Sequence, residues 1–144
     1  MNLVKFSCVV TTNNTGVPLG CEIWIDDACV VNLDHVKQST NVEHNFNDTD
    51  GEHVLRIILK NKRPEHTQVD AQGTIVSDAL LTVSNISFDE IDCTQIVQDH
   101  AVYRHNFNGT GADTEDRFFD TLGCNGTVEL KFTTPVYLWL LENM

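Results

Sequence analysis

Long hydrophobic runs are missing from this chain of 144 residues. No stretch reaches the roughly 18 apolar residues that a membrane-spanning helix needs. The opening segment, MNLVKFSCVV, also lacks the extended apolar region of a secretory signal peptide. We therefore expect no insertion into a membrane and no export by the general secretory route.

Positive charge is scarce as well. The chain has 9 Lys and Arg residues against 21 Asp and Glu residues, which gives a formal net charge of -12. Such a surface repels the phosphates of DNA and RNA, so we expect no nucleic-acid partner. A cationic partner or a bound cation is compatible with this charge.

Paired cysteine motifs are absent, because the five cysteines are odd in number and none forms a C-x-x-C pair. Cys8, Cys21 and Cys29 fall within apolar segments, where a free thiol behaves as a small buried hydrophobic group. We expect these three to be core thiols of a protein made in a reducing compartment.

Common catalytic signatures are also missing. The chain has no G-x-S-x-G, no glycine-rich phosphate loop and no HExxH, and its six histidines do not match the spacing of a structural zinc site. We therefore predict that the protein is not an enzyme and needs no cofactor, with calcium as the one candidate ion. A weak hydrolase that uses an Asp/Glu pair is the third-ranked alternative, because carboxylates are abundant enough to pair by chance.

Long amphipathic helices are not indicated, since the dominant hydrophobic period is two. Val4, Phe6, Cys8 and Val10 share one face of a predicted strand. Strand-like or hairpin patterns follow at residues 21–31, with Asp26 and Asp27 at the turn, and at residues 52–61, 78–91 and 126–134. A helical turn is predicted only at residues 94–99. These patterns predict an all-β fold, a jelly-roll-like antiparallel β-sandwich that forms a single domain over residues 1–144.

Two other segments carry specific expectations. Residues 62–73 form a polar stretch whose length is typical of a functional loop or of a loop that covers a sheet edge. The terminal VYLWLLENM, residues 136–144, is too apolar to remain in water. We expect this segment to be buried, either as the central strand of the sandwich or as a plug in another subunit.

The tetrapeptide HNFN occurs twice, at residues 44–47 and 105–108. The simplest interpretation is that two strands end in similar turns, each with its Phe, Phe46 or Phe107, inside the core. The Asn and Thr side chains would then bond the backbone of the following turn.

The first HNFN also leads into a group of hard oxygen ligands, the kind that calcium prefers. Four such residues lie close together in the sequence, namely Asn47, Asp48, Asp50 and Glu52. Their spacing does not fit an EF-hand. We therefore consider Asp48, Asp50 and Glu52 as a speculative calcium site, and Asn47, Asp48 and Asp50 as ligand-binding residues beside it.

Aromatic residues suggest two kinds of surface. Trp24 shares its predicted strand face with carboxylates. An outward-facing Trp beside carboxylates is typical of a sugar-binding surface and also of a protein interface. For a sugar site we consider Trp24 and Tyr103 as platforms. For a protein interface we predict Trp24, Tyr137, Trp139 and Leu140 as anchors, and we favour the interface.

The segments KNKRPEHTQVDAQGTIVSDALLTVSNISFDEI and GCNGTVELKFTTPVYLWLLENM resemble parts of small virion-associated proteins of tailed bacteriophages, especially marine myoviruses. The resemblance covers about the C-terminal two thirds of the chain. It implies a non-catalytic structural or receptor-facing role in a tail, fibre, baseplate or capsid decoration. It also implies synthesis in a bacterial cytoplasm, symmetric homo-oligomeric assembly and contact with other virion proteins.

The same middle segment is similar, at the level of fold, to calcium-dependent carbohydrate-binding β-sandwich modules. That likeness implies a cell-surface glycan as the ligand. A virion structural protein is therefore the predicted function, and a calcium-dependent carbohydrate-binding module is the alternative.

Overall fold

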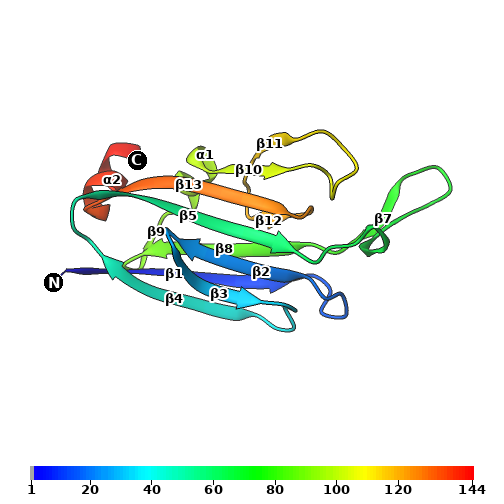
Figure 1. Cartoon of the computed structure of the whole chain (residues 1–144), viewed down its shortest axis with the longest axis horizontal. Helices are drawn as coiled ribbons and strands as arrows, with labels where there is room; N and C mark the ends of the chain where they lie inside the picture. Colours follow the sequence, from blue (N-terminus) through cyan, green and yellow to red (C-terminus); the bar gives the residue numbers. More distant parts are fainter. Residues whose placement is uncertain (1) are drawn as a thin grey trace.

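The computed structural model describes residues 2–144 and places two antiparallel sheets face to face (Figure 1). The first sheet has the order β12-β8-β1-β4, with β9 added beside β8. Its strands are β1 (Leu3–Thr12), β4 (Thr40–Asn47), β8 (Leu81–Phe88), β9 (Ile91–Asp92) and β12 (Thr121–Leu122).

The second sheet is larger and has the order β11-β10-β13-β5-β2-β3. Its strands are β2 (Gly20–Ile25), β3 (Ala28–Leu33), β5 (Gly51–Lys60), β10 (Val102–His105), β11 (Thr114–Arg117) and β13 (Gly126–Thr134). The predicted β2–β3 hairpin with its turn at Asp26 and Asp27 is present. The prediction of an antiparallel β-sandwich is confirmed.

The core lies between the sheets because alternate side chains of each strand point inward. On β1, Val4, Phe6, Cys8 and Val10 are all buried, as their spacing predicted. In the second sheet the inward residues lie opposite one another across strands, so that Ile57 is paired with both Ile23 and Val128. The buried side chains of both sheets form one hydrophobic cluster.

A bulge interrupts the alternation along β8, which the sequence predicted to be continuous. Leu81 and Val83 are buried at odd positions, whereas Ile86 and Phe88 are buried at even ones. Asn85 has a φ of 53° at the change of phase, where the pairing with β1 also shifts. Asn tolerates this left-handed conformation, and the extra residue returns the later apolar side chains to the core.

Helices are few and short. α1 (Thr94–His100) confirms the predicted helical turn. The C-terminal segment, however, is the helix α2 (Val136–Asn143), so the prediction of a central strand is wrong. Val136, Trp139 and Leu140 follow the i, i+3, i+4 spacing of one helix face and are buried, which matches the expected burial of this segment in part. No helix within residues 2–144 has the length and apolar character needed to cross a membrane.

The thiols differ in burial. Cys8 and Cys21 lie in the core as predicted, and Cys93 joins them. Cys29 is exposed on the edge strand β3, so the prediction that it is a core thiol is wrong. An edge strand packs on one side only, and the apolar pattern around Cys29 does not reveal that position.

Thiol labelling should reflect this difference. Burial raises the pKa of Cys8, Cys21 and Cys93 to about 12, so these thiols stay protonated and unreactive at pH 8. We expect Ellman's reagent to modify Cys29 rapidly and the three buried thiols only after unfolding. Loss of the fast phase in Cys29→Ser would identify the residue, whereas rapid modification of several thiols in that variant would contradict the burial.

Candidate functional site

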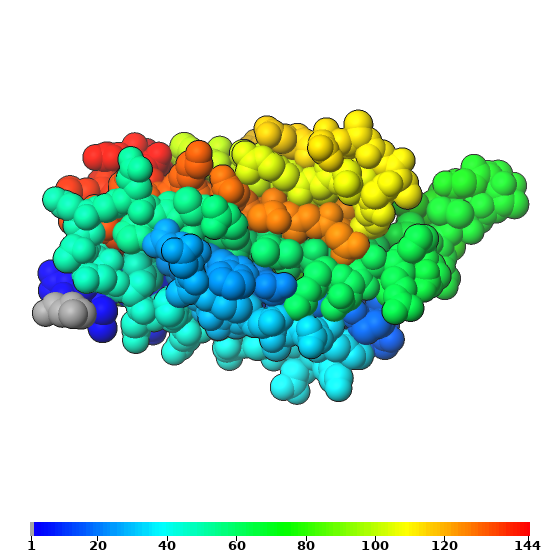
Figure 2. Space-filling model, viewed as in Figure 1, coloured from blue at the N-terminus to red at the C-terminus, as the bar shows by residue number. Residues whose placement is uncertain are grey.

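A two-stranded hairpin projects from one end of the sandwich (Figure 2). It consists of β6 (Thr67–Val69), β7 (Ile75–Asp78) and the turn between them, and we call residues 67–78 the arm. A short 3-10 helix, η1 (Pro64–His66), leads into it. The sequence predicted a polar loop at residues 62–73, and that prediction is wrong for the part from residue 67 onward. This part forms one strand of a hairpin that projects from the sandwich.

The root of the arm is fixed by a buried lysine. The Lys62 side chain is 0% exposed, and its Nζ lies 2.5 Å from Oδ1 of Asp78. The Thr67 hydroxyl donates to the same carboxylate oxygen at 2.6 Å. Asn125 holds the Lys62 backbone, accepting from its N–H at 2.9 Å and donating to its carbonyl at 2.8 Å. These bonds connect both strands of the arm to the sandwich.

The tip of the arm is also ordered by its own bonds. Oδ1 of Asp70 accepts from the backbone N–H groups of Gln72 and Thr74, each at 2.9 Å. Gly73 provides the positive φ of 83° that the turn requires. Asp70 is the only charged residue in residues 67–77, and its carboxylate is occupied by the turn.

The sides of the arm are apolar and uncovered. Val69, Ile75 and Val76 are 56%, 59% and 63% exposed. Val69 and Ile75 are cross-strand partners, so their side chains lie next to each other on one face of the hairpin. A projecting element with grouped apolar side chains is typical of a surface that another protein covers.

The helix α2 carries a second uncovered apolar surface. Trp139 and Leu140, predicted as interface anchors, are buried in the chain's own core, so that prediction is wrong for these two residues. Tyr137 is half exposed, while Leu138 and Leu141 are 57% and 69% exposed. We call Tyr137, Leu138 and Leu141 the α2 patch. A helix that buries one face leaves its opposite face outside, which a strand assignment could not predict.

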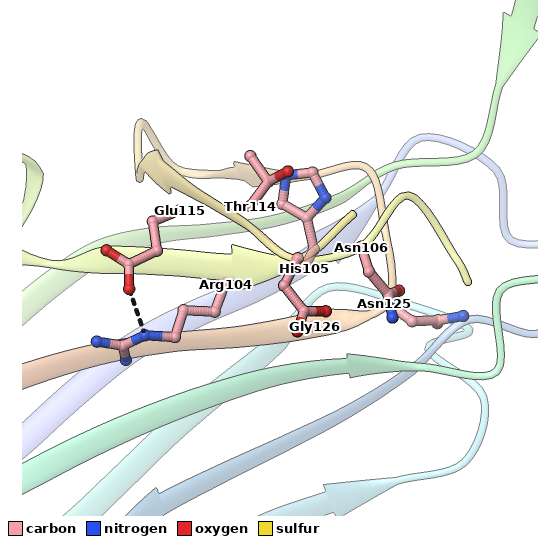
Figure 3. A pocket seen from close by; sticks show the side chains of 8 residues that line it. Arg104, His105, Asn106, Thr114, Glu115, Asn125 and Gly126 are labelled. Atoms are coloured by element: carbon pink, nitrogen blue, oxygen red, sulfur yellow. Dashed lines mark hydrogen bonds and ion pairs between the residues drawn. The ribbon is translucent and has the colours of Figure 1, made fainter. Parts of the chain in front are cut away.

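A pocket of about 690 Å³ lies between the β10–β11 hairpin and the start of β13 (Figure 3). Several of its side chains are paired within the chain: Arg104 lies 3.2 Å from Glu115 and 3.5 Å from Glu129. Gly126 is required at its floor, because a Cβ there would collide with the Arg104 carbonyl oxygen. Much of the charge around the pocket is therefore already neutralised within the chain.

The two HNFN segments do not share a structure. Phe46 is half buried and packs edge-on against Phe88 and Phe132, so its predicted place in the core is confirmed in part. Phe107 is 48% exposed with a φ of 56°, so its predicted place in the core is wrong. The backbone of residues 107–108 turns left-handed, and Oδ1 of Asn108 accepts from the Asn125 N–H at 2.7 Å. This turn points the Phe107 ring away from the core.

The first HNFN lies beside a chain of polar contacts that the sequence did not suggest. Nδ1 of His53 lies 2.6 Å from Oδ2 of Asp26, and Nε2 lies 3.0 Å from the Thr134 hydroxyl. The order resembles a nucleophile triad, but the Thr134 hydroxyl donates its hydrogen to the Thr49 carbonyl. Thr134 can therefore only accept from His53, and it is buried. The contacts join the strand ends and do not activate a nucleophile.

Asp26 should make stability depend on acid pH. Partial burial alone would raise its pKa, but hydrogen bonds from His53 and the Val54 N–H lower the pKa below the ordinary 3.8. A depressed pKa stabilises the fold above the unfolded pKa, and this contribution is lost as the pH falls through the folded pKa. We expect urea unfolding between about pH 2 and 5 to show a shallower pH dependence in Asp26→Asn than in the parent. An equal change in Asp27→Asn, at the same exposed turn, would contradict this assignment.

Two residues of the predicted calcium loop form hydrogen bonds with backbone N–H groups. Oδ1 of Asn47 accepts from the Thr49 N–H at 3.2 Å, and Oδ1 of Asp48 accepts from the Val136 N–H at 2.9 Å. Asp48 thus satisfies a free amide at the start of α2. Asp50 and Glu52 are exposed. In residues 2–144, no three His, Cys, Asp or Glu side chains come together as a group that could hold a metal ion.

The two predicted sugar platforms differ. Tyr103 is buried, and its hydroxyl accepts from the Cys124 N–H at 2.9 Å, so its prediction as a platform is wrong. Trp24 is half buried on the outer face of the second sheet, beside a carboxylate as predicted. Its Nε1 donates to Oε1 of Glu22 at 3.0 Å.

Comparisons of the chain with protein-family models, with curated proteins and with solved structures return no match. The description of its surfaces therefore depends on this chain's own geometry.

Proposed function

We propose that the chain is a non-catalytic subunit of a larger protein assembly, specifically a structural component of a phage virion. The observation that carries the proposal is the arm, which holds Val69, Ile75 and Val76 outside the sandwich on a root fixed by a buried ion pair. Exposed apolar side chains on a preordered element bind with little loss of conformational entropy. An arm of this kind is suited to contact with another subunit.

The resemblance to virion-associated proteins supports the same conclusion. It was carried by residues 60–91 and 123–144. The arm lies within the first of these segments, and the α2 patch lies within the second. The arm and the α2 patch therefore both lie in the segments that carry the resemblance.

Quantitative mass spectrometry of density-purified virions tests the proposal. We expect the chain at a constant ratio to the other particle proteins after a high-salt wash. The double variant Ile75→Ser/Val76→Ser should fold normally but enter particles roughly tenfold less well, because it removes an apolar contact. Phe119→Ser, at an exposed apolar residue outside the arm, is the matched control and should be incorporated normally. Absence of the chain from particles, or equal incorporation of the arm variant, would contradict the proposal.

The second candidate is a calcium-dependent carbohydrate-binding module, which the half-exposed Trp24 beside Glu22 favours. A sugar ring stacked on Trp24 would place its hydroxyls near carboxylates that accept hydrogen bonds. Glycan binding that disappears in Trp24→Ala and in EDTA would support this function. Glycan binding unchanged by both treatments would contradict it.

A further inference from the structure

The arm and the α2 patch lie at opposite ends of the long axis of the molecule (Figure 1). In Figure 1 the arm extends beyond the sandwich at one end, and α2 lies near the other end with the C-terminus. A single copy therefore cannot bring its own arm to its own α2 patch. Two different surfaces at opposite ends are the arrangement required for head-to-tail contact between copies.

Charge restricts which surfaces of two copies can meet. Each copy has a formal net charge of -12, so most contacts between copies bring like charges together. Residues 67–77 of the arm contain one charged residue, Asp70, whose carboxylate is occupied by the turn. Residues 136–141 of α2 contain none. These two surfaces can approach each other without burying an unpaired charge.

Both surfaces group their apolar side chains on one side of a regular element. Leu138 and Leu141 are three residues apart and lie on the same side of α2, with Tyr137 four residues before Leu141. Val69 and Ile75 form one apolar face of the arm. A short hairpin face can lie along such a helix stripe, burying apolar groups that are otherwise exposed on both copies.

We propose that copies of this chain associate head to tail, with the arm of one copy packed on the α2 patch of the next. This association rests on the proposed function, and in it the partner that the arm contacts is a second copy of the chain. The contact joins two different surfaces, so a repeated contact produces a ring if the rotation closes and a filament if it does not. Each copy contributes one arm and one α2 patch.

Sedimentation velocity of the purified chain tests the contact. We expect the 16.2 kDa chain to form larger species as its concentration rises from about 5 to 500 μM, the range expected for an interface of small area. Association should strengthen between about 0.05 and 0.5 M salt, because salt screens the repulsion between acidic copies. A chain that stays monomeric throughout, or whose association weakens with salt, would overturn the inference.

Two variants make the test specific. Val69→Ser/Ile75→Ser removes the apolar face of the arm, and Leu138→Ser/Leu141→Ser removes the two leucines of the α2 patch. Each should be monomeric alone with an unchanged circular dichroism spectrum. Mixed together, they should form a heterodimer and nothing larger, because one intact arm and one intact patch remain. Phe119→Ser should associate like the parent.

Other outcomes identify other contacts. A self-complementary arm contact would leave the α2 variant dimeric and would give no heterodimer on mixing, which overturns the head-to-tail assignment. A parent chain that stays monomeric but is present in virions, with incorporation that needs the arm, overturns the inference alone, since the arm then binds a different subunit. A chain absent from virions that still associates head to tail contradicts the virion proposal alone.

Discussion

The Trp139→Ala variant is expected to lose about 3–5 kcal/mol of unfolding free energy, the range observed when a large aromatic side chain is removed from a core. Trp139 closes one end of the sandwich, where its ring packs edge-on against two phenylalanine rings. The distance between ring centroids is 6.3 Å to Phe88 and 6.0 Å to Phe132. Those two rings are buried and cannot collapse into the space without moving strands from both sheets.

Urea denaturation measures this loss, with Trp24 as the remaining fluorescent reporter. Trp139→Phe should recover part of the stability, because it keeps an aromatic ring in the site. Leu141→Ala, on the exposed face of the same helix, is the matched control and should change stability by less than about 0.5 kcal/mol at a low protein concentration. A Trp139→Ala variant as stable as the parent would contradict the packing described for α2.

The Lys62→Met variant is expected to lose about 3 kcal/mol of unfolding free energy, because the partly buried carboxylate of Asp78 is left without its cation. The Lys62 side chain is fully buried at 2.5 Å from that carboxylate. Methionine fills a similar volume, so the loss reports charge and hydrogen bonding more than a cavity. The arm should also become easier to cleave in limited proteolysis, since its root loses an anchor.

A second substitution separates these effects. In the Lys62→Met/Asp78→Asn variant the unpaired charge is absent, so part of the lost stability should return. The Thr67 contact also involves Asp78, and for that reason the recovery should be incomplete. If Lys62→Met is neutral, or if the double variant is less stable than the single one, the ion pair does not fix the root of the arm as described.

Much of the sandwich could be predicted because a half-buried strand shows its inward face in the sequence. The spacing of Val4, Phe6, Cys8 and Val10 identified the face of β1 that is buried. The same reasoning failed at β8, because one extra residue at Asn85 reverses the alternation and has no hydrophobic signal of its own.

The terminal helix was missed because a continuous apolar run has no clear period. The run VYLWLL is compatible with a buried strand and with a helix. Only the i, i+3, i+4 spacing of Val136, Trp139 and Leu140 favours the helix. Burial of Trp139 then followed from packing between α2 and the sheets. The identity of the exposed face depended on the same assignment, so Leu138 and Leu141 were not predicted as surface residues.

The candidate surfaces were only partly accessible to sequence reasoning. The arm has a hairpin signal in its sequence, because a turn with Gly73 lies between the β-branched residues Thr67, Val69, Ile75 and Val76. The polar composition of residues 62–73 obscured this signal. The buried Lys62 had no such signal, because its partner Asp78 is brought beside it by the fold. His53, Asp26 and Thr134 likewise come from three separate strand ends.

The position of α2 has a consequence for synthesis. Residues 136–143 leave the ribosome after every strand of both sheets, yet they supply the ring that covers Phe88 and Phe132. Until those residues emerge, a nascent chain presents its aromatic interior to water at one open end. Chaperones that recognise exposed aromatic groups have this interval in which to bind, and it ends when the helix docks.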